Sequence, residues 1–101
     1  MKTIWKFPLE TTDSQEIQMP VGINLLDIQI QYKSPNLWGI VDTEAKKEVR
    51  TIKIFGTGSE IPKDFYLSEW IYLGSYQILS YSNLLVFHAF INNDNFVNSK
   101  L

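Results

Sequence analysis

Apolar and polar residues alternate with a period of two in short runs along this chain, and this pattern restricts the fold more than any other feature. The clearest run is Leu26–Lys33, in which Leu26, Ile28, Ile30 and Tyr32 are expected to face a core. Such alternation is typical of a strand with one buried face. No run keeps a 3.6-residue period long enough for a stable amphipathic helix, so the pattern predicts a β protein.

Similar runs, separated by turn residues, cover residues 3–9, 16–21, 26–33, 37–42, 49–55, 70–79 and 84–91. In the second run Ile17, Met19 and Val21 are expected to point inward. Hairpin turns are predicted at Ser34-Pro35-Asn36 and at Tyr81-Ser82-Asn83. The spacing predicts an all-β fold, either a small antiparallel β-barrel or a β-sandwich of about seven short strands.

The composition indicates one small domain. The chain has 101 residues, of which 45% are hydrophobic, and we expect residues 1–91 to form a single β domain and residues 92–101 a polar C-terminal tail. No signal-like or membrane-spanning apolar segment is visible, so we expect no membrane contact and a cytoplasmic location. The net charge is −2 and the basic residues are scattered, so a nucleic-acid partner is not expected.

Groups that carry enzyme chemistry are scarce. The sequence has no cysteine, which excludes disulfides, thiolate metal sites and cysteine nucleophiles. His88 is its single histidine, and it shares a predicted strand face with Leu84, Val86 and Phe90. A lone histidine lacks the partners that nucleophilic catalysis or zinc binding requires. We therefore expect no enzyme, no catalytic residue, no metal and no cofactor, and a structural role for His88.

One glycine-rich turn is a candidate ligand site. Backbone amides in such a turn can bind an anion, and lysines flank this one. No helix follows and no Gly-Lys-Ser/Thr ends it, so it matches neither the dinucleotide fingerprint nor the P-loop. A plain β-turn is the competing interpretation. The candidate residues are Lys53, Gly56, Thr57, Gly58, Ser59 and Lys63.

Aromatic residues are the informative excess, at 14% of the chain. Core packing accounts for most of them, but two strands carry apolar groups on both faces. This favours a second covered face: a barrel, a dimer or a partner site. We expect Trp5, Trp38 and Tyr72 to be partner-binding candidates, because Trp and Tyr dominate binding hot spots. We expect Ile4, Trp38 and Ile40 to mediate self-association if the chain is a homodimer and not a closed monomeric barrel.

Several short motifs, in this order, resemble a family of short, functionally uncharacterised proteins encoded by bacteriophages and prophages. They are Met1–Leu9, Met19–Gly22, Leu37-Trp38 followed by Val41-Asp42, Phe55–Gly58 followed by Ile61-Pro62, and Leu85–His88. The resemblance covers nearly the whole chain up to Phe90. Members of that family often carry a histidine after the Gly-Thr-Gly run, where Ser59 stands here, and often end near the position of Phe90 after a glycine-containing turn.

The resemblance implies a phage context and no assigned activity. Small accessory phage proteins commonly bind and block a host protein or a defence signal. Our first hypothesis is therefore a phage-encoded accessory binding protein that inhibits or redirects a host protein in the cytoplasm of the infected bacterium, such as a defence component. The alternative is a barrel that binds a small molecule or a nucleotide signal as a sponge. A weaker alternative is a structural virion component.

Overall fold

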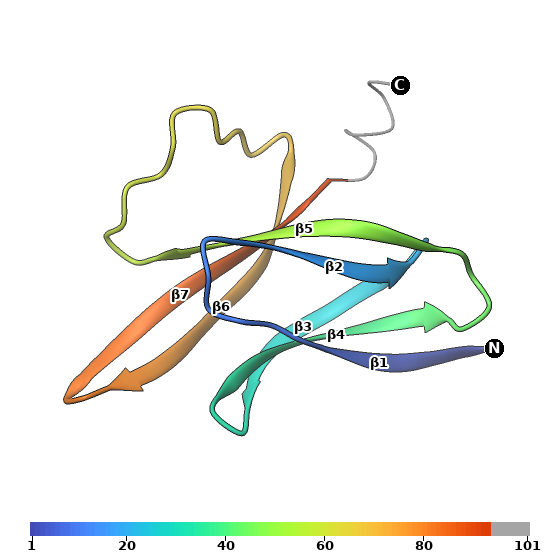
Figure 1. Ribbon diagram of the computed structural model, residues 1–101, viewed down its shortest axis with the longest axis horizontal. Helices are drawn as coiled ribbons and strands as arrows, with labels where there is room; N and C mark the ends of the chain where they lie inside the picture. Colours follow the sequence, from blue (N-terminus) through green and yellow to red (C-terminus); the bar gives the residue numbers. More distant parts are fainter. Residues whose placement is uncertain (94–101) are drawn as a thin grey trace.

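A computed structural model of the protein describes residues 1–93, which form seven antiparallel strands in two sheets (Figure 1). The strands are β1 (Lys2–Pro8), β2 (Ser14–Pro20), β3 (Asn24–Gln31), β4 (Ser34–Asp42), β5 (Lys47–Gly56), β6 (Trp70–Ser80) and β7 (Asn83–Asn92). The predicted all-β class is confirmed. The two sheets are not closed into a barrel, so of the two expected architectures the chain adopts the sandwich.

Sheet A has the strand order β1-β4-β3, and sheet B has the order β2-β5-β7-β6. Only β3–β4 and β6–β7 are tight hairpins, since the other ladders join strands that are not consecutive. No helix among residues 1–93 is long and apolar enough to cross a membrane.

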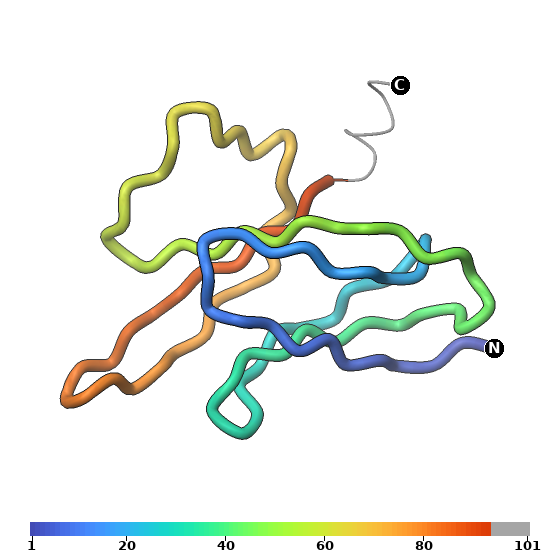
Figure 2. Tube along the Cα trace, in the orientation of Figure 1, coloured from blue at the N-terminus to red at the C-terminus, as the bar shows by residue number. Residues whose placement is uncertain are grey.

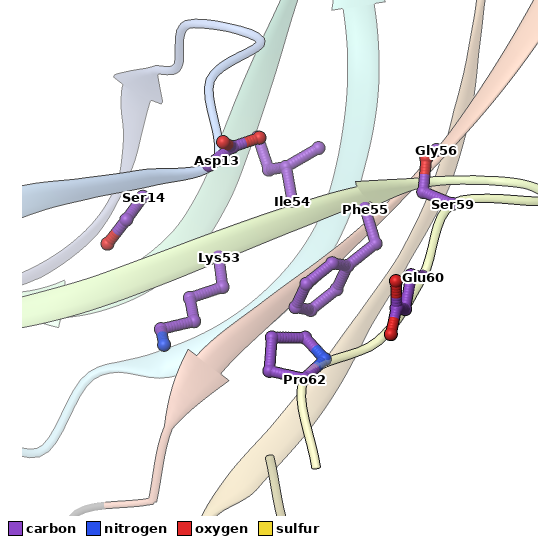
Figure 3. Close-up of a pocket in the computed structure, with 9 residues that line it drawn as sticks. All are labelled: Asp13, Ser14, Lys53, Ile54, Phe55, Gly56, Ser59, Glu60 and Pro62. Carbon is purple, nitrogen blue, oxygen red and sulfur yellow. The ribbon is translucent and has the colours of Figure 1, made fainter. Parts of the chain in front are cut away.

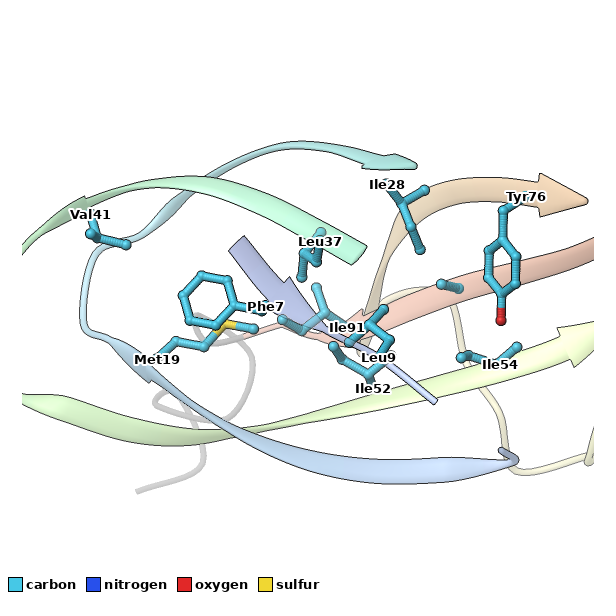
Figure 4. Close-up of a cluster of buried hydrophobic side chains, with 11 residues drawn as sticks. Phe7, Leu9, Met19, Ile28, Leu37, Val41, Ile52, Ile54, Tyr76 and Ile91 are labelled. Atoms are coloured by element: carbon cyan, nitrogen blue, oxygen red, sulfur yellow. The ribbon is translucent and has the colours of Figure 1, made fainter. Parts of the chain in front are cut away.

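The hydrophobic core lies between the facing surfaces of the two sheets (Figure 4). Sheet A supplies Phe7, Ile28, Leu37 and Val41, and the loop after β1 supplies Leu9. Sheet B supplies Met19, Ile52, Ile54, Tyr76, Ala89 and Ile91. Alternate residues of each strand fill this layer, as the period-two pattern predicts for two packed sheets.

The sequence misplaces one side chain of β3 and one in each of the two adjoining turns. A bulge between Leu25 and Asp27 adds one residue, so Leu26 is 50% exposed and is not in the core. Tyr32 is also exposed, because the hairpin turn is Tyr32-Lys33 and not Ser34-Pro35-Asn36. Ile30 is at an inward-facing position, as predicted, but it is exposed because it lies next to this turn, at the end of the sheet. Val21 lies in the turn after β2 and is exposed.

Asn92, which the sequence pattern places at the start of the tail, is the last residue of β7. The Asn92 side-chain oxygen accepts a hydrogen bond from the Thr51 amide at 2.8 Å, and its backbone oxygen accepts one from the Arg50 guanidinium at 2.6 Å. Arg50 is buried and also pairs with Glu48 at 3.7 Å. Residues 94–101, the rest of the predicted tail, lie outside the described residues.

Candidate functional site

The outer face of sheet B is covered by the chain itself. The loop of residues 57–69 connects β5 to β6 (Figure 1). Its Phe65 side chain packs on this face. The Phe65 ring lies 5.0 Å from Phe55, 5.1 Å from Phe90 and 5.4 Å from Trp70, measured between ring centroids. Apolar rings on the outer face of sheet B are therefore packed under a loop of the chain itself. The two strands for which the sequence predicts two apolar faces, β1 and β4, lie in sheet A.

His88 fastens the start of this loop to the sheet. Its Nε2 atom lies 2.8 Å from the Thr57 hydroxyl and its Nδ1 atom lies 3.0 Å from the Tyr72 hydroxyl. A neutral imidazole donates through one nitrogen and accepts through the other, so both hydroxyls satisfy it. The expected structural role agrees with this geometry, which connects β7, β6 and the loop.

The glycine-rich turn uses two of its backbone amides internally. The Thr57 amide donates to Val86 O at 2.9 Å and the Ser59 amide donates to Gly56 O at 3.0 Å. Gly58 takes a positive φ of 90°. Such a turn has few amides to offer to a bound anion, so the geometry favours the plain β-turn.

A hollow of about 270 Å³ lies beside this turn (Figure 3). Among the predicted ligand residues, Lys53, Gly56 and Ser59 line it, while Lys63 is exposed on the loop outside it. The carboxylates of Asp13 and Glu60 line it too, and the Lys53 ammonium lies 5.1 Å from the centre of the Trp70 ring. Two carboxylates against one lysine disfavour a phosphate group at this place.

The three predicted partner-binding aromatics lie on three different surfaces. Trp5 pairs with Gly39 on the inner face of sheet A, where it packs against the core. Trp38 lies on the outer face of sheet A, and Tyr72 lies on the outer face of sheet B beside His88. They do not form one site.

The predicted self-association residues do share one surface. Ile4 of β1 lies opposite Ile40 of β4. Trp38 precedes Ile40 by two positions in β4, so its side chain lies on the same side of the sheet. Ile4 is 57% exposed, and Trp38 and Ile40 are half-buried by their neighbours within the sheet. Sheet B packs on the opposite, inner face of β1 and β4, so it does not cover this surface.

A further apolar surface, which we call the hairpin end, lies where the tips of the β3–β4 and β6–β7 hairpins project on the same side of the molecule (Figure 2). The two sheets open here, and a hollow of about 320 Å³ is lined by residues from both hairpins. Tyr32 is 91% exposed and Tyr81 is 99% exposed at the two tips. The exposed apolar side chains of the hairpin end are Ile30, Tyr32, Leu79, Tyr81, Leu84 and Leu85.

Both tips place bulky residues in a backbone conformation that normally favours glycine or asparagine. Tyr32 and Lys33 have φ values of 53° and 67°, and Tyr81 has a φ of 55°. Two-residue hairpin turns require positive φ at one or both positions, which Asn and Gly adopt at little cost. Tyrosine there carries strain, and such strain gathers at functional sites.

Sequence reasoning missed the hairpin end for an identifiable reason. It placed Tyr32 in the core by extending the alternation of β3 one residue too far, and it treated Tyr81 only as a turn residue. Two residues separate the end of β3 from the start of β4, and two separate β6 from β7. The two-residue spacing could have predicted both hairpin turns, but it is a weak signal because neither turn has the usual Asn-Gly or Gly.

Comparison with known proteins places the chain in a family. The family model described as a domain of unknown function, DUF7352, matches residues 1–99. The chain belongs to the DUF7352 family. No curated protein and no solved structure matches it. The description of DUF7352 assigns no activity, so no catalytic or binding residue is carried over from it.

Proposed function

We propose that this chain is a phage-encoded accessory protein that binds a host protein through its hairpin end and inhibits or redirects it. The observation that carries the proposal is the pair of tyrosines at the two tips, both almost fully exposed and both held at positive φ. Tyrosine supplies a large, rigid contact area at low conformational-entropy cost and is enriched in binding hot spots.

The surroundings of the two tyrosines fit a protein partner. Apolar side chains of Leu79, Leu84 and Leu85 continue the surface, and monomeric proteins rarely leave such clusters uncovered without a purpose. Lys33 is the charged residue that lines the hollow between the hairpins. An apolar centre with a charged group at its edge is the usual composition of a protein interface.

The nucleotide alternative gains less support. The turn that suggested it has two of its amides bonded within the chain, and the adjoining hollow contains two carboxylates. The hollow on the other side of the turn, about 440 Å³ in volume, is lined mainly by Leu84, Leu85, Val86 and Phe87 and so is continuous with the hairpin end.

The test is affinity capture from a bacterial lysate, followed by titration of the purified partner. We expect Tyr81→Ser to weaken binding by at least about tenfold, which corresponds to the loss of one hot-spot side chain. Tyr66→Ser is the matched control, because Tyr66 is an exposed tyrosine on the loop of residues 57–69, away from the hairpin tips. Equal binding by Tyr81→Ser and the unsubstituted chain, or no specifically retained protein, would refute the proposal.

A further inference from the structure

The outer face of sheet A carries a charge pattern that complements itself. In the register of this sheet, Trp38 of the central strand lies opposite Lys6 on one side and Asp27 on the other. By register, the row across the sheet therefore reads Lys6, Trp38, Asp27. Within one copy the Lys6 ammonium lies 5.8 Å from the centre of the Trp38 ring and donates to Gln31 Oε1 at 2.8 Å, so a pair with Asp27 of a second copy would replace this neutral acceptor by a carboxylate. The next row towards the N-terminus of β1 reads Ile4, Ile40, Asn24.

A two-fold axis parallel to β4, between two facing A sheets, brings the positive side of one copy against the negative side of the other. Rotation by 180° about such an axis places β1 of one copy over β3 of the other and leaves β4 over β4. Lys6 then faces Asp27 of the second copy, twice, and the Trp38 side chains meet at the centre. An axis across the strands would instead place Lys6 against Lys6 and Asp27 against Asp27, which like-charge repulsion disfavours.

We infer that two copies of this chain pack through the outer faces of their A sheets, with Trp38 and Ile40 at the centre and two Lys6–Asp27 ion pairs at the sides. This assembly rests on other residues than the proposed function does. It accounts for the apolar groups on this face, which no loop among residues 1–93 covers in the way that the loop of residues 57–69 covers sheet B.

The charges at the rim of the face permit this arrangement. Asp42 lies at the end of β4, where the two copies of it would approach the axis. Its carboxylate is 3.5 Å from the N-terminal ammonium of its own chain and accepts a hydrogen bond from the Glu44 amide at 3.1 Å. The same ammonium lies 3.9 Å from the Glu44 carboxylate, and Lys2, opposite Asp42 in the ladder, adds a second positive charge. The two carboxylates at this corner are therefore matched by two cations within each copy.

Three strands give a small interface. Strands lie about 4.8 Å apart, so the face is only about 15 Å wide. Stable complexes bury about 1,200–2,000 Å² in total, so this dimer belongs to the weak class, with a dissociation constant on the order of tens of micromolar. Sedimentation velocity from 5 to about 500 µM therefore covers the expected transition.

The charge pattern allows a test that separates pairing from folding. Lys6→Asp and Asp27→Lys should each weaken dimerisation by about tenfold to a hundredfold, because each converts two attractive pairs into two repulsive ones. Mixed in equal amounts, the two variants should form a heterodimer, since every pair across the interface is then complementary. Ile40→Glu should give a monomer at every concentration.

Each outcome decides the question. A heterodimer that forms only in the mixture supports the inference, and it also shows that both variants are folded. A monomer mass for the unsubstituted chain at 500 µM would overturn it. So would a dimer that persists in Ile40→Glu, or two charge variants that stay monomeric when mixed.

Discussion

Replacement of Tyr32-Lys33 by Asn-Gly should stabilise the fold while removing part of the binding surface. Both residues have positive φ in the β3–β4 turn, with values of 53° and 67°. A left-handed conformation costs a residue with a side chain roughly 1–2 kcal/mol, and Asn and Gly pay little of it. Gly also loses about 0.5–1 kcal/mol through its greater freedom in the unfolded chain. We therefore expect a net gain of about 1–2 kcal/mol.

Thermal unfolding followed by circular dichroism measures this gain. For a domain of this size 1 kcal/mol corresponds to about 4–8 °C, so the melting temperature should rise by roughly 5–15 °C. Gln29→Asn is the matched control: it introduces the same residue type at an exposed position inside β3, where the backbone is extended, and it should stabilise nothing. Partner binding should fall in the turn variant. An unchanged or lower melting temperature would show that the turn is not strained, and the reason for assigning a function to it would be lost.

Three further changes test other parts of the structure. Gly39→Ala would place a Cβ 2.7 Å from Ile23 Cδ1, and denaturant unfolding should show a loss of about 1–3 kcal/mol, part of which Ile23→Ala recovers in the double variant. Burial raises the pKa of Tyr76, so the folded chain keeps this proton where the unfolded chain loses it. The free energy of unfolding of the unsubstituted chain therefore falls as pH rises above 10, whereas Tyr76→Phe has no hydroxyl to titrate. The difference in unfolding free energy between the two chains should become smaller above pH 10. His88→Leu should speed amide hydrogen exchange at Thr57 while core strands keep their protection.

The sequence pattern predicts strands well wherever one face of a strand is fully buried. β5 and β7 show this, because alternate residues such as Ile52, Ile54, Ala89 and Ile91 fill the core in register. The pattern fails at the start of β3, where one extra residue exposes Leu26 while Ile28 stays in the core. The bulge at Leu26 has no mark in the local sequence, since a leucine suits either face.

The turn of the β3–β4 hairpin was predicted at the wrong residues, because Pro35 and its neighbours are common in turns. Pro35 resembles a turn residue, but it lies inside β4, paired with Ile30. A strand tolerates proline at positions where its amide is not needed for a ladder hydrogen bond. Which positions these are depends on the neighbouring strands, so the local sequence does not show it.

The candidate site was the least predictable part, because it depends on distant segments. The hairpin end forms only where β3 lies against β6, and the cover over sheet B forms only where Phe65 reaches Phe55 and Phe90. The shared face of Ile4 and Ile40 was easier to predict. Alternation shows which residues of each strand lie on one face, and the register of two neighbouring strands then brings those residues together.

The strand order also determines when each part of the chain can fold during synthesis. β1 pairs with β4, from Lys2 opposite Asp42 to Pro8 opposite Asn36, and β2 pairs with β5. A ribosome adds about 5–20 residues per second, so the first two strands wait several seconds for their partners while the β3–β4 hairpin closes at once. An unpaired strand can pair with another nascent chain. Two lysines and a proline in β1, at Lys2, Lys6 and Pro8, disfavour that encounter until β4 has left the ribosome.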